Sequence, residues 1–190
     1  MLAPYLIQVL LKEGSHSFIA ASFVTIFLGI LFILANLERE FRLNLRQTFL
    51  FSTLAWFSVA CFGSLPFLLS NEDFSLSDAF FESMSGITTT GATIIPNLDN
   101  SPKSILLWRA IMQWLGGIGI VVMAITILPL LKVGGMQLFK MEGPDTTEKI
   151  LPRTIEVATI IISTYIILTF ICGLFYWVFG MSIFDSVSPV

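Results

Sequence analysis

Four long apolar stretches, none with a charged residue, limit what this chain can fold into. A hydrocarbon core about 30 Å thick needs roughly 20 apolar residues per helix, which each stretch meets or nearly meets. Only 12% of the 190 residues are charged, and soluble domains carry about twice that share. The sequence therefore predicts an all-α membrane protein. The expected spans are Gly14–Leu37, Gln47–Asn71, Ala110–Leu131 and Val157–Phe184.

Two apolar segments need a separate interpretation. Val157–Phe184 is longer than one span requires, so we expect it to tilt or to include a short loop near Gly180. Leu2–Leu11 is too short to span, and it has neither the basic start nor the cleavage site of a signal peptide. We expect it to be the end of a helix whose beginning is missing.

The charges of the loops predict which side of the membrane each one faces. Glu38–Arg46 and Lys132–Glu156 carry most of the basic residues, which favour the cytoplasm. Lys132–Glu156 is also rich in Gly and Pro and is expected to be a turn-rich connector. Glu72–Arg109 is mainly acidic, so we expect it on the outer side.

The segment Phe74–Pro96 is semi-apolar but too short and too polar to cross the membrane, so we expect it to enter and return on the same side. Ser75 and Asp78 have the spacing of a helix N-terminal cap, which predicts a short helix ending near Gly86. The expected apolar side of that helix consists of Leu76, Ala79, Phe80 and Met84.

A turn rich in threonine and glycine follows this helix, at Thr88–Thr93. β-Branched residues favour helix poorly, and irregular backbone at membrane depth occurs only where it is buried in protein or lines a water-filled path. Backbone carbonyls and threonine hydroxyls are suitable ligands for a dehydrated cation, and Gly91 gives the backbone freedom to orient its carbonyls. The turn therefore suggests an ion path, although it is also compatible with a simple cap on a hairpin.

Other polar or small residues leave alternatives open. Glu82 either forms hydrogen bonds behind the turn or lies near an outer mouth that attracts cations. Arg109 is expected at the outer interface, paired with Asp99, in preference to a direct contact with the turn. A group of small residues lets helices pack closely or lets a helix bend. These residues are Gly116, Gly117 and Gly119.

Several functional classes are disfavoured. Cys61 and Cys172 lie in apolar runs without metal-ligand spacing, and His16 is interpreted as a solvated loop residue. No Ser/His pair or metal motif supports an enzyme. Basic residues are spread singly, so nucleic acid is not an expected partner. A secondary transporter that binds another solute at a broken helix remains the alternative to a cation path.

The order of motifs resembles the first pore repeat of the Trk/Ktr/HKT superfamily of potassium transporters, most closely its TrkH-type members. The resemblance rests on four motifs in the family's order. They are Asp78-Ala-Phe-Phe-Glu-Ser83, Gly86-Ile-Thr-Thr-Thr-Gly-Ala-Thr93, Trp108-Arg109 and Gln113-Trp-Leu-Gly-Gly-Ile-Gly-Ile120.

The resemblance implies a fold of four helix, pore loop, helix repeats around one pore, of which this chain carries an N-terminal part. Residues 1–37 would be extra N-terminal helices, the first one truncated, and 47–131 the first repeat. Residues 132–156 would be a cytoplasmic connector and 157–190 the start of the second repeat. In that second repeat, Ser182 and Asp185 repeat the spacing of Ser75 and Asp78.

The resemblance also implies the transported ion and its ligands. Potassium would be held by main-chain oxygens around Thr89, Thr90 and Gly91, with Ala92 and Thr93 towards the outer mouth. Asp78, Glu82 and Gly86 would belong to the pore helix. One such strand supplies about a quarter of a coordination cage. A single filter glycine suggests weak discrimination against sodium, and the choice between potassium and sodium stays open.

The same resemblance implies a location and partners. The protein would be a multi-pass protein of the bacterial plasma (inner) membrane, in contact with the lipid bilayer. Expected partners are the remaining repeats, a second copy in a homodimer and a cytosolic nucleotide-binding regulatory subunit. No cofactor is expected beyond the transported K⁺.

Overall fold

A computed structural model describes residues 1–13, 16–37, 45–70, 74–96, 98, 101–131 and 147–188. The chain divides into two compact units, Met1–Gly116 and Gly117–Pro189, which are described separately. Every regular element in the described ranges is a helix, so the predicted all-α class is confirmed. Most of the Gly- and Pro-rich connector, 132–146, and Asp99 lie outside the described residues.

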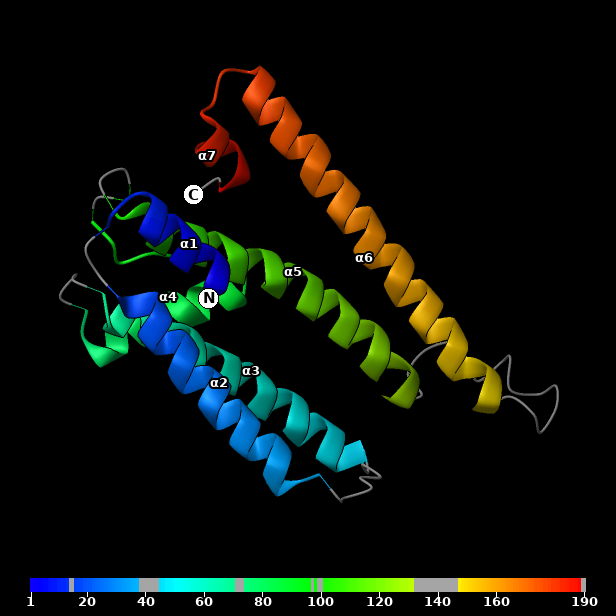
Figure 1. The fold of residues 1–190 in the computed structure, drawn as a ribbon. Coiled ribbons are helices and arrows are strands. Elements are labelled where there is room, and N and C mark those ends of the chain that lie inside the picture. Colours follow the sequence, from blue (N-terminus) through cyan, green and yellow to red (C-terminus); the bar gives the residue numbers. More distant parts are fainter. Residues whose placement is uncertain are drawn as a thin grey trace. The chain divides into compact units, whose positions relative to one another are not determined.

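Seven helices follow one another among the described residues (Figure 1). They are α1 Leu2–Leu10, α2 Ser17–Ala35, α3 Leu45–Leu68, α4 Leu76–Ile87, α5 Lys103–Leu131, α6 Thr147–Val178 and α7 Ile183–Val187. The first unit contains α1 to α4 and the start of α5, and the second contains the rest of α5 with α6 and α7.

Four of these helices are long and apolar enough to cross a membrane, as the sequence predicts. The candidate spans are Ser17–Ala35, Arg46–Leu68, Lys103–Ala124 and Glu156–Val178. The final helix is interrupted as expected, because α6 ends at Val178 and Gly180 adopts a φ of 99° before α7 begins. That left-handed conformation is favourable for glycine, so Gly180 is a natural place for the chain to leave the helix.

The short helix α4 begins with the predicted cap. The backbone N–H of Asp78 donates to Oγ of Ser75 at 3.2 Å, and the backbone N–H of Ser75 donates to Oδ2 of Asp78 at 3.2 Å. This reciprocal capping box satisfies N–H groups that a helix start leaves unpaired. The helix runs one residue beyond the predicted end at Gly86.

The predicted apolar side of α4 is partly wrong. Leu76 is 74% exposed, whereas Glu82 and Ser83 are fully buried. Oγ of Ser83 donates to the carbonyl of Ala60 in α3 at 2.6 Å, which compensates its loss of water. The helix therefore buries a polar side, because its neighbours offer polar partners that hydrophobic periodicity does not reveal.

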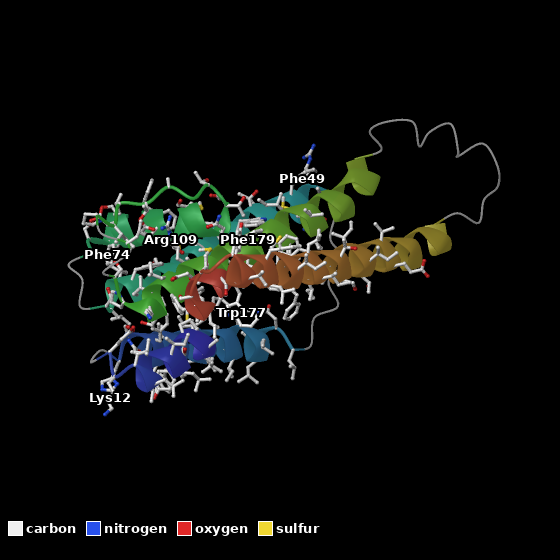
Figure 2. The ribbon with its side chains drawn as sticks, turned by 90° about the horizontal axis from the view of Figure 1, so that it is seen from above. Lys12, Phe49, Phe74, Arg109, Trp177 and Phe179 are labelled. Atoms are coloured by element: carbon white, nitrogen blue, oxygen red, sulfur yellow. The ribbon has the colours of Figure 1, made fainter. Side chains whose placement is uncertain are left out.

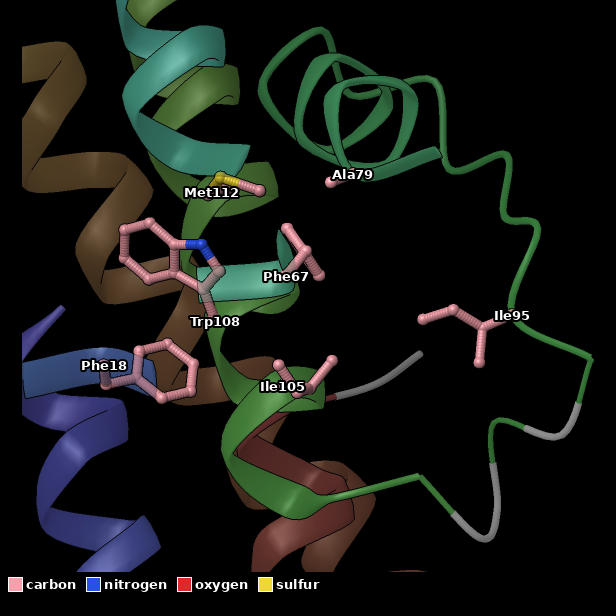
Figure 3. Packing of buried hydrophobic residues seen from close by; sticks show 7 residues of the cluster. All are labelled: Phe18, Phe67, Ala79, Ile95, Ile105, Trp108 and Met112. Carbon is pink, nitrogen blue, oxygen red and sulfur yellow. The ribbon is translucent and has the colours of Figure 1, made fainter. Parts of the chain in front are cut away.

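An apolar cluster in the first unit joins the helices to the loop after α4 (Figure 3). The ring of Phe18 in α2 meets the ring of Trp108 in α5 edge to face, with centroids 6.2 Å apart. Nε1 of Trp108 donates to the carbonyl of Gly63 in α3 at 3.0 Å. Ile95 belongs to the same cluster, so the far end of the loop is anchored in the core.

Glu13 fixes the beginning of α5. Its Oε1 accepts from the backbone N–H of Lys103 at 2.8 Å, and its Oε2 accepts from the hydroxyl of Ser104. A carboxylate at a helix start satisfies unpaired N–H groups and complements the helix dipole. The contact ties the turn after α1 to the helix that carries Trp108 and Arg109.

Gly116 in α5 packs directly against the end of α4. A Cβ on Gly116 would lie 2.8 Å from the carbonyl carbon of Ile87, closer than real Cβ contacts allow. This contact favours close packing over bending as the role of Gly116.

We predict that Gly116→Ala lowers the stability of the protein by about 1–3 kcal/mol, because the added methyl group overlaps backbone that cannot move aside. Thermal unfolding in detergent, followed by Trp fluorescence, measures the change. Gly29→Ala in α2 is the matched control, since nothing lies within 4 Å of its Cβ position. Equal unfolding temperatures for both variants would contradict the packing role.

Candidate functional site

The loop Thr88–Pro96 leaves α4 through a Schellman motif, a pair of hydrogen bonds that closes a helix end. The N–H of Thr90 donates to the carbonyl of Ser85 and the N–H of Thr89 donates to that of Gly86, both at 3.0 Å. Thr89 has a φ of 57°, in the left-handed region where this motif usually places glycine. A β-branched residue there is strained, and such strain concentrates at functional sites.

Glu82 holds the outgoing half of the loop against α4. Its Oε1 accepts from Oγ1 of Thr93 at 2.6 Å and from the backbone N–H of Ile94 at 2.6 Å. The side chain is completely buried. Of the two roles considered for Glu82, hydrogen bonding behind the loop is the one observed.

Arg109 reaches the same loop from α5, where its side chain lies inside the first unit (Figure 2). One guanidinium nitrogen, Nη2, donates to the carbonyl of Gly91 at 3.0 Å and to that of Ala92 at 3.1 Å. Nε lies 3.1 Å from Oε2 of Glu82, as an ion pair without the angle of a directed hydrogen bond.

The expectation that Arg109 does not contact the turn directly is therefore wrong, because its side chain is 5% exposed and donates to the loop. Its expected partner, Asp99, lies outside the described residues. A signal for this contact exists in the sequence. Glu82 lies in an apolar helix and needs a cation if it is buried. Arg109 and Lys103 are the basic residues in the segment from Glu72 to Arg109, and Arg109 has the more apolar surroundings. The structure identifies Arg109 as the basic partner of Glu82, which the sequence pattern alone does not.

The buried pair contributes more to specificity than to stability. Opposite unit charges this close attract by roughly 4–5 kcal/mol at an effective dielectric constant of 20. Removing both groups from water costs a similar amount of free energy, so the net contribution of the pair to stability is small. Losing one partner destabilises the fold much more, because the other charge remains buried and uncompensated. The pair thus requires α4, α5 and the loop to keep their positions.

The loop carbonyls fall into two groups. The carbonyl of Ala92 accepts from Arg109 and also from Oγ of Ser85 at 2.6 Å, while that of Gly91 accepts from Arg109. In the part of the chain that the structure describes, the carbonyls of Thr89 and Thr90 accept no hydrogen bond. These two oxygens are available to an ion.

The remaining predicted site residues support the loop. Asp78 caps α4, and Gly86 is buried where a Cβ would meet Cε of Met112 at 3.2 Å. The side chain of Thr93 is bound to Glu82. No cluster of His, Cys, Asp and Glu that could hold a metal ion occurs in the described ranges.

The second unit repeats the local structure that begins α4. Oγ of Ser182 accepts from the backbone N–H of Asp185 at 3.2 Å and donates to Oδ2 of Asp185 at 2.7 Å. The helix α7 begins directly after Ser182. The same Ser-x-x-Asp spacing therefore starts a short helix after a long apolar one in both units.

Comparison with known proteins gives a consistent assignment. A family model described as a cation transport protein, TrkH, matches residues 14–188. The Trk system potassium uptake protein TrkH of Vibrio parahaemolyticus is 43% identical, covering 99% of this chain and 40% of that protein. Its counterpart in Escherichia coli is 40% identical with the same coverage. The crystal structure of the potassium transporter TrkH from Vibrio parahaemolyticus aligns with a TM-score of 0.84 at 39% identity, over 99% of this chain and 38% of that one.

The helices and their four candidate spans define a multi-pass, all-α membrane protein, and the family match places it among cation transport proteins. The chain belongs to the TrkH family of cation transport proteins. The predicted location, in the inner membrane, agrees with the family and the four candidate spans. The chain spans about 40% of the length of the curated relatives it matches.

We predict that Glu82→Ala destabilises the protein by about 3–5 kcal/mol, because it leaves Arg109 buried without its counter-charge. Glu82→Gln should be milder, since an amide oxygen still accepts from Thr93 and Ile94. Thermal unfolding in detergent measures both changes.

Asp78→Asn is the control for this prediction, because it removes a carboxylate from the cap of the same helix and is expected to lower stability by about 0.3–1 kcal/mol. The prediction is wrong if Glu82→Ala is no more destabilising than Asp78→Asn.

Proposed function

We propose that the loop Thr88–Thr93 forms one strand of a potassium selectivity filter, in a whole protein that takes up K⁺ across the bacterial plasma membrane. The names of the relatives support this proposal, since the two reported above are called potassium uptake proteins. Because the chain spans about 40% of their length, uptake is a property proposed for the complete assembly of repeats.

The single observation that carries the proposal is the pair of carbonyl oxygens on Thr89 and Thr90, which accept no hydrogen bond within the described residues. Both residues are exposed in this chain. In the proposed assembly, where strands from further repeats would surround them, unbonded carbonyls would need a replacement for water, and a dehydrated cation is such a replacement. The C-terminal end of α4 lies beside them, and its partial negative charge favours a cation.

A full coordination cage requires oxygens from more than one strand. A dehydrated K⁺ takes about six to eight oxygens, and filters present rings of backbone carbonyls from four strands. We propose that Thr89 and Thr90 bind the ion in this strand, with Gly91, Ala92 and Thr93 towards the outer mouth. Further repeats, the first of them beginning at residue 157 with α7 as the start of its pore helix, would supply the other strands. Residues 47–131 would form the first helix, pore loop, helix repeat.

The proposed partners follow from the family and the surface. Apolar side chains on α2 and α6 are extensively exposed, which suits contact with lipid. A homodimer and a cytosolic nucleotide-binding regulatory subunit are proposed by resemblance alone. The expected connector 132–156, whose last ten residues form the start of α6, is the proposed contact region for the regulatory subunit.

Flux measurements on the complete protein in proteoliposomes test the proposed function. We expect uptake of Rb⁺ or Tl⁺ that K⁺ inhibits by competition. Transport of an organic solute without cation flux would instead favour a secondary transporter with a broken-helix binding site, and would overturn the proposal.

We predict that Gly91→Ser shifts selectivity towards Na⁺, with the K⁺ over Na⁺ ratio falling roughly tenfold. Gly91 has a φ of 75° that L residues resist, so a side chain there distorts the peptide planes of the loop. Competition of Na⁺ with Rb⁺ uptake measures the ratio.

Gly180→Ser is the matched control, because Gly180 also has a positive φ and open space around its Cβ position, but lies outside the loop. We expect it to leave selectivity unchanged. An unchanged ratio in Gly91→Ser would count against a filter role for this glycine.

A further inference from the structure

The guanidinium of Arg109 is a fixed positive charge directly behind the proposed filter strand. Its Nη2 contacts the carbonyls of Gly91 and Ala92 at 3.0 and 3.1 Å. The side chain is 5% exposed, so little of the guanidinium is open to water. Two consecutive carbonyls are thereby held towards α5 by one donor.

These contacts divide the oxygens of the strand. The carbonyls of Gly91 and Ala92 are occupied from behind, whereas those of Thr89 and Thr90 accept no hydrogen bond among the described residues. Coordination number and oxygen position decide which monovalent cation a filter prefers. The residue that holds the first pair of carbonyls therefore influences which ion the second pair fits.

The charge of Arg109 would by itself repel a cation in the loop. Glu82 offsets it, because Oε2 lies 3.1 Å from Nε and the carboxylate is fully buried. Its other oxygen is bound to the loop at Thr93 and Ile94. The two side chains together hold the loop from Gly91 to Ile94 while adding no net charge behind it.

We infer that Arg109 helps to determine the ion selectivity of the loop, because it fixes the carbonyls of Gly91 and Ala92. Glu82 offsets the positive charge of Arg109, so that this charge does not repel the ion. The inference rests on the proposed function, since it concerns the selectivity of that same loop. Neither residue needs to touch the ion, so both act by positioning the loop and by their field.

Two variants that change the net charge behind the loop in opposite directions distinguish an electrostatic role of the pair from a merely structural one. Glu82→Gln keeps the acceptor for Thr93 and Ile94 but leaves a net positive charge behind the loop. Arg109→Gln leaves a net negative charge and releases the two carbonyls. A structural defect would move both variants in the same direction, whereas an electrostatic effect moves the apparent KM for the cation in opposite directions.

The experiment measures Rb⁺ uptake and its inhibition by Na⁺ in the complete protein, at matched amounts in proteoliposomes. We expect Glu82→Gln to raise the KM for Rb⁺ roughly fivefold and Arg109→Gln not to raise it. We expect Arg109→Gln to lower the K⁺ over Na⁺ ratio roughly tenfold. The double variant should restore the KM towards the wild-type value while the ratio stays low.

If Arg109→Gln does not fold, Arg109→Lys tests whether Arg109 determines selectivity. Lysine keeps the charge but lacks the guanidinium fork that binds the loop carbonyls through Nη2 while Nε faces Glu82. One ammonium cannot hold both positions, so the selectivity ratio should fall while KM stays near the wild-type value. Lys103→Gln, a neutralisation in the same helix outside the loop contacts, should behave as wild type.

Two results would overturn the inference. One is an equal rise of KM in Glu82→Gln and Arg109→Gln with an unchanged selectivity ratio. The other is an Arg109→Lys variant with wild-type selectivity. The proposed function fails separately, if the wild-type protein carries no cation flux at all, so the two failures are distinguishable.

Discussion

The buried ion pair between Glu82 and Arg109 is the interaction on which the rest of the first unit depends. It joins α4 and α5, and through Oε1 of Glu82 and Nη2 of Arg109 the pair also holds the loop from Gly91 to Ile94. Two buried charges are tolerated only with close partners, so α4, α5 and the loop must keep one arrangement.

The loop stores strain that its surroundings hold in place. Thr89 adopts a conformation that suits glycine, and the two hydrogen bonds that close α4 maintain it. Ile95 then anchors the far end in the apolar cluster with Trp108 and Phe18. A backbone held in one conformation by its surroundings is a suitable ligand set for an ion, because it loses little order when the ion binds.

Family membership and the local repeat of structure point to the same larger architecture. The chain matches its TrkH relatives over almost all of its own length but covers about 40% of theirs. Ser182 and Asp185 begin α7 with the same hydrogen bond by which Ser75 and Asp78 begin α4. In the proposed architecture, the filter strand described here becomes functional only when further strands surround it.

The sequence by itself determined the four apolar helices, the capped start of α4 and the irregular loop after it. These features depend on residues close together in the chain, such as Ser75 with Asp78, and on the apolar length that a bilayer requires. Only the tertiary structure decided the place of Arg109 and the polar buried side of α4. Glu82 and Arg109 are 27 positions apart, and hydrophobic periodicity assigns a charged residue to the surface. Their burial becomes favourable only when α4, α5 and the loop bring opposite charges and carbonyls into contact.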